Sequence, residues 1–232
     1  MASGAIAVSG YTHKLGPYSS HTALLESLPA DGRGKRVLDV GCATGYLAEI
    51  LARRGFQVVG IERPGGYGAN FPESVELVEA DLDAGVPPLR GRFSYVICGD
   101  ILEHLRDPEK MLKQLAEMLE PDGALIASLP NSGNLYFRLT ILRGKFPRED
   151  KGLFDRTHLH FYMWEGWRDL FESAGFVVHE RNVTGVPVGL ALPKWDGSAA
   201  VRALEWAAHL LARIRPPLFA YQFVVTARRR NS

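Results

Sequence analysis

One nine-residue segment, residues 37–45, constrains the fold of this 232-residue chain more than any other. It reads Val-Leu-Asp-Val-Gly-Cys-Ala-Thr-Gly, an apolar run suited to a strand covered on both faces, followed by glycines that permit a sharp turn. After it, Leu47, Ile50 and Leu51 recur at helical spacing, and Gly55 is typical of a helix C-terminus. A strand, a glycine turn and a helix in this order place backbone N–H groups at the carboxyl edge of a sheet. There they form a cradle for a small polar ligand.

The glycine spacing in this segment narrows the ligand. A dinucleotide-binding fingerprint that starts at Gly41 requires two further glycines, at positions that Ala43 and Tyr46 occupy. The spacing instead resembles the first motif of class I S-adenosylmethionine-dependent methyltransferases, an acidic residue followed by Gly-x-Gly-x-Gly. Asp39, Gly41 and Gly45 match that motif, and Ala43 departs from it at the middle glycine.

Two acidic positions downstream extend the resemblance. Glu62 follows an apolar strand over residues 56–61, and a carboxylate there can accept hydrogen bonds from both hydroxyls of a ribose. The run 75–82 alternates apolar residues and ends in Asp81 and Leu82. In the family, an acidic residue at this point meets the amino group of adenine.

A fourth landmark completes the pattern. The buried strand predicted over residues 93–98 ends in Gly99 and Asp100, which resembles the family's fourth motif, beside the methionine part of the cofactor. Four landmarks in the right order make the match specific. The resemblance covers about residues 20–230 and implies S-adenosyl-L-methionine as the cofactor. It implies these cofactor-binding residues: Asp39, Gly41, Cys42, Ala43, Thr44, Gly45, Tyr46, Glu62, Asp81, Leu82, Gly99 and Asp100.

Composition excludes several classes of partner. The formal net charge is +1, which gives no global field for nucleic acid. No apolar run approaches membrane-spanning length, and the N-terminus lacks the pattern of a signal peptide. The only cysteines, Cys42 and Cys98, predict reduced thiols rather than a disulfide scaffold. We therefore expect a cytoplasmic protein, monomeric or homodimeric, without a transmembrane segment or a nucleic-acid partner.

Alternating strand and helix patterns predict an α/β fold. We expect a Rossmann-like, doubly wound sheet of about seven strands with helices on both faces, in one domain over residues 21–230 after a flexible segment 1–20. The resemblance implies that the last strand inserts antiparallel. In the stretch 63–74, glycines and prolines predict that the second covering helix is short or broken.

Other elements are predicted as follows: helices at 21–28, 107–119 (capped by Asp107), 164–174 and 196–214, a turn at 121–123, and strands at 124–129, 176–180 and 219–227. The last helix and strand form a C-terminal unit, 196–227. Its helix is expected to pack on the sheet or on a second subunit, although peripheral membrane contact stays open. The helix at 21–28 is expected to lie over the cofactor pocket, which makes Tyr18, Ser19 and His21 contact candidates.

The segment 131–163, inserted after the fifth strand, is the predicted lid for the acceptor because it is longer than a plain connection requires. Its polar and basic side chains suit a hydroxyl-rich or anionic substrate. Its sequence resembles bacterial methyltransferases of glycan biosynthesis and, more loosely, the methyltransferase-like protein of methionine biosynthesis. The polar and basic residues are Asn131, Asn134, Tyr136, Arg138, Arg143, Lys145, Arg148, Asp155, Arg156, His158 and His160.

The predicted catalytic residues are His158, Asp155 and His104. Methyl transfer to a hydroxyl needs a base, and histidine titrates in the right range. His158 is the first candidate, with Asp155 or Asp100 orienting it or binding the acceptor, and His104 is the second. A structural role for these histidines is the competing interpretation. A metal site made of Asp155, His158 and His160 is a minor alternative, so no metal is predicted.

The leading functional prediction is O-methylation of a sugar or glycan precursor. One alternative is methylation of a small secondary metabolite, because aromatic residues in the lid can line an apolar pocket. The other is a noncatalytic partner protein that keeps the fold. The aromatic residues are Tyr136, Phe137, Phe146, Phe154 and Phe161.

Overall fold

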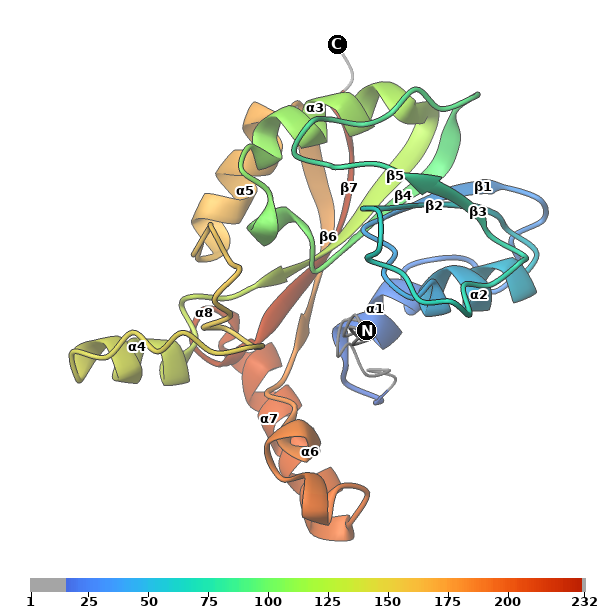
Figure 1. The fold of residues 1–232 in the computed structure, drawn as a ribbon. Coiled ribbons are helices and arrows are strands. Elements are labelled where there is room, and N and C mark those ends of the chain that lie inside the picture. Colours follow the sequence, from blue (N-terminus) through green and yellow to red (C-terminus); the bar gives the residue numbers. More distant parts are fainter. Residues whose placement is uncertain (1–15, 231–232) are drawn as a thin grey trace, which may run out of the picture.

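The structure is a computed structural model that describes residues 16–230, apart from the side chains of residues 190 and 191. The described residues form one seven-stranded sheet in the order β3-β2-β1-β4-β5-β7-β6 (Figure 1). Along the sheet, β3, β2, β1, β4 and β5 each pair in parallel with the next strand, and β7 lies antiparallel between β5 and β6. The strands are β1 (Arg36–Val40), β2 (Gln57–Glu62), β3 (Glu76–Glu79), β4 (Phe93–Gly99), β5 (Leu119–Pro130), β6 (Phe176–Thr184) and β7 (Gln222–Arg229).

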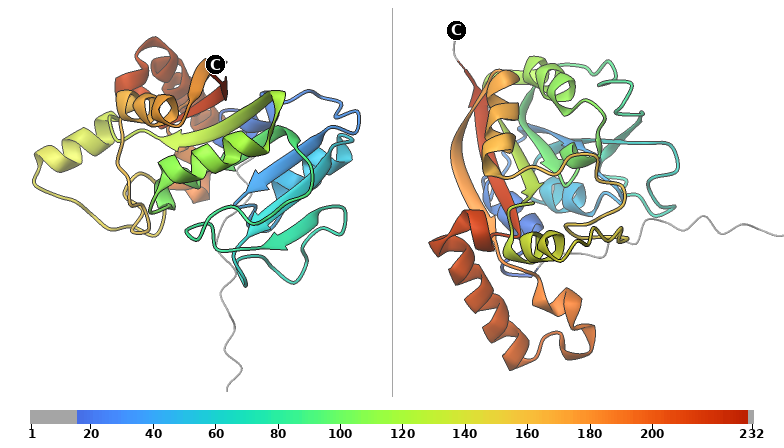
Figure 2. Two further views of the ribbon diagram at one scale, coloured as in Figure 1. Left: turned by 90° about the horizontal axis from the view of Figure 1, so that it is seen from above. Right: turned by 90° about the vertical axis from the view of Figure 1, so that its left-hand side faces the viewer.

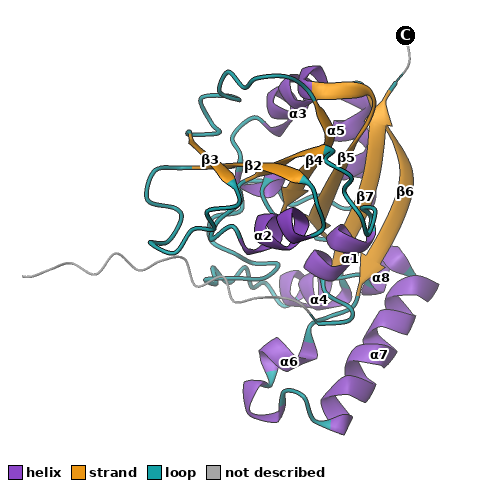
Figure 3. Cartoon of the chain, turned by 90° about the vertical axis from the view of Figure 1, so that its right-hand side faces the viewer, coloured by secondary structure: helices purple, strands orange, loops and turns teal. Residues whose placement is uncertain are grey.

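Helices cover both faces of the sheet, as the sequence predicts. Helices α1 and α2 lie on one face, and α3 and α5 lie on the other (Figures 1 and 3). Helices α4, α6 and α7 extend beyond the end of the sheet (Figure 2). The helices are α1 (Ser20–Glu26), α2 (Tyr46–Arg53), η1 (Leu102–His104), α3 (Pro108–Met118), α4 (Leu135–Leu142), α5 (Trp164–Ser173), α6 (Val188–Ala191), η2 (Pro193–Trp195), α7 (Ala199–Ile214) and α8 (Pro216–Phe219).

The apolar run of β1 serves two separate layers of the core. Val37 belongs to the cluster under α1 and α2, whereas Leu38 and Val40 belong to the cluster under α3 and α5. All three side chains are fully buried. A strand covered on both faces therefore explains the nearly continuous apolar sequence.

Most predicted element boundaries lie within a few residues of the observed ones. Asp107 caps α3 by accepting a hydrogen bond from the backbone N–H of Lys110. The predicted turn at 121–123 is wrong, because β5 already begins at Leu119. The register between β4 and β5 shifts there, so the residues form an irregularity within the strand and not a separate turn. Strand β6 also runs four residues further than predicted, to Thr184.

The sequence predicts that the second covering helix is short or broken in residues 63–74. This is confirmed, since no helix lies between β2 and β3 in the described chain. Of the predicted flexible segment 1–20, residues 1–15 lie outside the described residues. Ser19 within it caps α1 through the N–H of Thr22.

The helices beyond the sheet expose apolar side chains. In α7, Trp206 is 57% exposed and Ile214 is 70% exposed, so the predicted packing of this helix on the sheet holds only for its inner face, which includes buried Val201 and Ala212. In α4, Leu142 is 83% exposed. Within the described residues, no helix combines the length and apolar character that a membrane span requires.

Candidate functional site

The segment that joins β1 to α2 forms the predicted cradle. Gly41 and Gly45 have φ values of 74° and 76°, and Gly45 is the residue before the first turn of α2. Ala43 also has a positive φ, 47°, which is rare for a residue with a side chain. A Cβ atom at Gly45 would lie 2.7 Å from the Phe71 ring, so any other residue there would strain the backbone and require Phe71 and Pro72 to shift.

Two carboxylates lie beside this turn. Glu62, at the end of β2, accepts hydrogen bonds from the N–H of Ala43 at 2.8 Å and from the N–H of Arg63 at 3.0 Å. Asp39 is buried in β1, and its Oδ2 atom has no hydrogen-bond partner among the described residues. Burial, and then the charge of Glu62, raises the pKa of Asp39 to about 7. The turn therefore faces a region of negative potential.

The third predicted landmark lies at the same edge of the sheet. Asp81 follows β3 and is exposed, and its Oδ1 atom accepts a hydrogen bond from the N–H of Asp83 at 3.0 Å. Leu82 is half-buried beside it. In β3, Glu79 accepts a hydrogen bond from the Tyr67 hydroxyl, which ties the loop after β2 to this edge.

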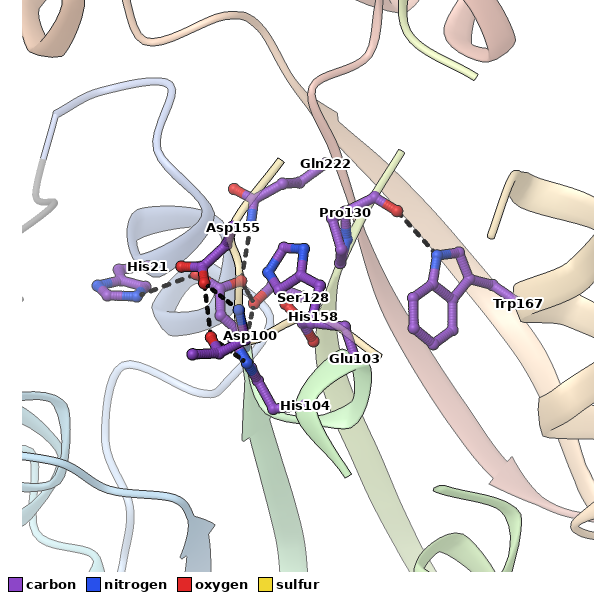
Figure 4. A network of polar contacts seen from close by, with 11 residues as sticks. His21, Asp100, Glu103, His104, Ser128, Pro130, Asp155, His158, Trp167 and Gln222 are labelled. Carbon is purple, nitrogen blue, oxygen red and sulfur yellow. Dashed lines mark hydrogen bonds and ion pairs between the residues drawn. The ribbon is translucent and has the colours of Figure 1, made fainter. Parts of the chain in front are cut away.

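Asp100 joins elements that are distant in sequence. It follows β4 with a φ of 53°, and its carboxylate accepts hydrogen bonds from the Ser128 hydroxyl of β5 and from Gln222 Nε2 of β7, the latter at 2.6 Å. His21 Nε2 of α1 lies 3.9 Å from the other carboxylate oxygen (Figure 4). The His21 ring also contacts Tyr46, with centroids 5.3 Å apart, so α1 covers the end of the cradle as predicted.

The minor alternative of a metal group made of Asp155, His158 and His160 does not match the described residues, in which the group with metal-ligand geometry is Glu103, His104 and His158. His160 Nε2 lies 2.9 Å from the Leu105 carbonyl oxygen, and its Nδ1 atom lies 3.3 Å from the Tyr162 hydroxyl. His160 therefore ties the lid to the loop after η1.

Two lid residues predicted to face the substrate are structural. Asn131 and Asn134 are buried, and each side chain donates a hydrogen bond to the Ala220 carbonyl at 2.9 Å. Their amides hold the start of the lid against the segment before β7, so they are not available to an acceptor.

The structure gathers a different trio at the same place. Glu103 and His104 of η1 lie beside His158 of the lid. Each residue offers one nitrogen or oxygen atom, and the three atoms lie within 4.8 Å of one another. Glu103 is 1% exposed, and its Oε1 atom lies 3.9 Å from His158 Nε2. The lid is fastened there because the Leu159 N–H donates to the Glu103 carbonyl at 2.8 Å.

Asp155 is linked to His104, a connection that the sequence does not predict. Its Oδ1 atom accepts hydrogen bonds from the backbone N–H of Thr157 at 2.8 Å and from the Thr157 hydroxyl. The same hydroxyl lies 3.0 Å from Nδ1 of His104. Asp155 therefore supports His104 through Thr157, and the carboxylate beside His158 is Glu103.

Aromatic rings from the lid form a cluster next to these polar groups. Phe137 and Phe154 stack with centroids 4.4 Å apart, and Phe146 meets Phe154 and Phe161 edge to face. Phe161 reaches His158, with centroids 6.0 Å apart. The aromatic cluster of the lid, whose rings Phe137 and Phe154 are buried, is thus adjacent to the predicted base.

The two cysteines are in environments that disfavour the nucleophilic thiolate form. Cys42 and Cys98 are buried and free, and burial followed by the charge of Asp39 raises the pKa of each thiol above its ordinary value. Such thiols stay protonated and are poor nucleophiles.

Comparisons with known proteins give the context of this site. The model of a family described as "Methyltransferase domain" matches residues 12–181. Two curated relatives, each named ubiquinone biosynthesis O-methyltransferase, come from Aeromonas salmonicida and Azoarcus. The first is 31% identical over 66% of this chain and 66% of its own length, and the second is 36% identical over 42% and 45%. The chain spans about half to two thirds of the length of the curated relatives it matches.

Solved structures share the fold. An S-adenosylmethionine-dependent methyltransferase from Mesorhizobium loti is 18% identical with a TM-score of 0.63, over 91% of this chain and 98% of its own. Magnesium protoporphyrin IX methyltransferase from Synechocystis, with bound S-adenosylhomocysteine, is 19% identical with a TM-score of 0.56, over 91% and 80%.

Proposed function

Because the chain belongs to the methyltransferase-domain family, we propose that it transfers a methyl group from S-adenosylmethionine to a hydroxyl oxygen of a small-molecule acceptor. The observation that carries the proposal is the meeting of the acidic cradle after β1 with the histidine cluster of η1 and the lid at one edge of the sheet. The names of the curated relatives support oxygen as the acceptor atom.

The cradle fits the chemistry of this cofactor. S-adenosylmethionine carries positive charge on its sulfonium and amino groups, and buried Asp39 offers a carboxylate oxygen that has no hydrogen-bond partner within residues 16–230. Each Glu62 oxygen accepts one backbone N–H and keeps lone pairs for a ribose hydroxyl. We assign binding to the twelve residues predicted from the sequence, with Asp39 and Glu62 as the main anchors.

When bound, the cofactor supplies an electrophilic methyl carbon, which forms a bond to the acceptor oxygen while its bond to sulfur breaks. The chain must hold the acceptor in line and remove its proton. His158 is the proposed base, because its side chain is 7% exposed and its Nε2 atom lies 3.9 Å from Oε1 of the buried carboxylate of Glu103.

The aromatic cluster of the lid favours a flat aromatic acceptor with a phenolic hydroxyl. Phe137 and Phe154 are buried inside the cluster, whereas Phe146 is 49% exposed and Phe161 is half-buried, so these last two rings can contact a planar apolar group through their faces and edges. A sugar hydroxyl, the prediction from the sequence, is the second candidate. Asp100 and Gln222 favour it, since both are polar side chains at this edge that can bond several hydroxyls.

The proposal is tested by calorimetry and by a methylation assay. Wild-type protein should bind S-adenosylmethionine, and its transfer of labelled methyl should be compared across a panel of phenols and sugars. The variant His158→Ala should lose turnover and keep cofactor affinity within about twofold, because the residue acts on the acceptor side. Equal loss of both would make His158 structural, and absence of cofactor binding at millimolar concentration would overturn the function.

A noncatalytic partner role is the remaining outcome of that assay. It would give cofactor binding without methyl transfer to any acceptor, together with recovery of a stoichiometric partner enzyme in a pull-down. His158→Ala would then leave recovery of the partner unchanged.

A further inference from the structure

The loop between β2 and β3, residues 63–75, begins with a tight turn in the place where the sequence predicts a short or broken helix. The N–H of Gly66 donates to the carbonyl of Arg63 at 2.9 Å, with Pro64 and Gly65 between them. Gly65 has a φ of 74°, and proline followed by such a glycine is typical of a type II turn. The chain therefore folds back over the end of β2 as soon as that strand ends.

This turn places Gly66 directly against the carboxylate of Glu62. A Cβ atom at position 66 would overlap Glu62 Oε1 and would lie 2.9 Å from Glu62 Cδ. Gly66 is not among the glycines with a positive φ, so its backbone conformation is open to any residue. Glycine at this position is therefore required by the space that the Glu62 carboxylate occupies.

Backbone N–H groups hold the same carboxylate in place from two sides. Glu62 Oε2 accepts a hydrogen bond from the N–H of Ala43 at 2.8 Å, and Oε1 accepts one from the N–H of Arg63 at 3.0 Å. These bonds fix the carboxylate between the turn after β1 and the turn after β2. Because an ionised carboxylate has about four acceptor positions, each oxygen can also accept one hydroxyl of a vicinal diol.

A tyrosine fastens the loop to the neighbouring strand. The Tyr67 hydroxyl donates to the carboxylate of Glu79 in β3, and Glu79 is the register partner of Glu62. The Tyr67 ring also meets the Phe71 ring edge to face, with centroids 5.8 Å apart, and Phe71 packs beside Gly45. The loop is thus anchored both at β3 and at the turn after β1.

We propose that Gly66 determines specificity for a ribose with both hydroxyls free, and that Tyr67 is the positioning residue that holds the turn over Glu62. The inference rests on the proposed function, because it takes Glu62 as the ribose anchor of S-adenosylmethionine. The missing side chain at position 66 leaves the carboxylate where it can accept both hydroxyls. The ligands of this part of the site are adenosine compounds with an unsubstituted 2′,3′-diol.

The main experiment compares adenosine with 2′,3′-dideoxyadenosine, which lacks both hydroxyls, in calorimetric competition with S-adenosylhomocysteine. Wild type should prefer adenosine by at least about tenfold, because a charged acceptor strengthens each hydrogen bond. In Gly66→Ala the preference should fall below about twofold, since the new methyl group displaces the end of the Glu62 side chain. The matched control is Gly65→Ala in the same turn. Its Cβ meets nothing within 4 Å, so it should keep the preference although its positive φ strains the turn.

A second set of variants tests the positioning role of Tyr67. Tyr67→Phe and Glu79→Ala should each weaken S-adenosylhomocysteine binding about three- to tenfold and lower the preference for adenosine. The double variant should be no weaker than either single variant, because both remove the same contact. Glu79→Gln keeps an acceptor for the hydroxyl and should restore most of the affinity. Glu76→Ala, an exposed glutamate of the same strand, is the control and should bind like wild type.

The outcomes separate this inference from the methyltransferase function. An unchanged preference for adenosine in Gly66→Ala, with the variant folded by circular dichroism, overturns the role of Gly66. Equal weakening of adenosine and dideoxyadenosine in Tyr67→Phe overturns the role of Tyr67, and this variant carries the test alone if Gly66→Ala does not fold. A wild type that binds S-adenosylhomocysteine without preferring adenosine refutes the inference and leaves the proposed function standing. No binding of S-adenosylhomocysteine to wild type would refute both.

Discussion

The Thr157 hydroxyl lies 3.0 Å from Nδ1 of His104, and it donates its proton to the carboxylate of Asp155. This chain of contacts joins the lid to η1 and sets the tautomer of a histidine that is distant in sequence. The ring of the neighbouring His158 meets the His104 ring edge to face, with centroids 4.7 Å apart. The Thr157 hydroxyl thus determines which nitrogen of His104 carries the proton.

Replacing Thr157 with valine should therefore impair turnover without affecting cofactor binding. Valine keeps the shape and removes the hydroxyl, so the His104 ring loses its tautomer preference. We expect kcat to fall about tenfold, with cofactor affinity unchanged in calorimetry. Thr157→Ser should restore most of the rate, since it keeps the hydroxyl. A loss of thermal stability equal in the valine and serine variants would mean that Thr157 only packs.

The pKa of Asp39 predicts a pH dependence of cofactor binding. Burial and the neighbouring Glu62 raise that pKa to about 7, and a cationic ligand binds the ionised form. Below pH 7 the carboxyl must first lose its proton, so affinity should fall about tenfold between pH 8 and pH 6. Calorimetry of S-adenosylmethionine binding at several pH values measures this. Asp39→Asn should bind more weakly at pH 8 and lack the slope, and an unchanged slope would contradict the assignment.

The same residue predicts how stability changes with pH in the unliganded protein. The folded pKa of Asp39 exceeds its ordinary value of 3.8, so between these values the folded state holds a proton that the unfolded state has lost. The contribution of Asp39 to stability is thus greatest below about pH 4 and is lost as pH rises toward 7. Denaturant unfolding should show Asp39→Asn gaining stability relative to wild type as pH rises. A difference that does not vary with pH would refute this.

The buried indole of Trp167 gives a prediction about the core. Its Nε1–H donates to the Pro130 carbonyl at 2.8 Å, which fixes α5 against the end of β5, where the lid begins. Trp167→Phe should lower the free energy of unfolding by about 1–3 kcal/mol, because a buried acceptor loses its partner and a void is left. Urea unfolding measures the loss. Trp206→Phe on the exposed face of α7 is the matched control and should change stability by less than about 0.5 kcal/mol.

The sequence predicts the turn after β1 and the strand ends beside it because these signals are local. The turn after β1 depends on glycines at fixed positions, and Glu62 and Asp100 each directly follow an apolar strand. Parallel strands bring such residues to one edge of the sheet, so spacing along the chain translates into proximity. The antiparallel insertion of β7 came from the family resemblance, and pairing confirms it.

The acceptor side depends on contacts between distant segments, which no local pattern encodes. The sequence analysis did not select Glu103, because polar residues are common after a strand. Its position between apolar Leu102 and His104 could nevertheless have indicated a buried acid. Gln222 reaches Asp100 from 122 residues away and gave no signal. Asp155 was predicted to orient His158 or to bind the acceptor, and its link to His104 through Thr157 is a contact that nearness in sequence did not indicate.

The departure at Ala43 leads to the last prediction. Its φ of 47° is a conformation that costs a residue with a Cβ about 1–2 kcal/mol, and glycine adopts it freely. Glycine also increases the entropy of the unfolded chain, which offsets about 0.4–1 kcal/mol. Ala43→Gly should therefore raise the free energy of unfolding by up to about 1 kcal/mol, measured in urea. Ala48→Gly, inside α2, is the control and should lose stability, because helix interiors disfavour glycine.

Cofactor affinity in Ala43→Gly should stay equal or improve, since the N–H of residue 43 keeps its bond to Glu62. A large loss of affinity would mean that the methyl group of Ala43 itself contacts the cofactor, which the motif resemblance does not predict.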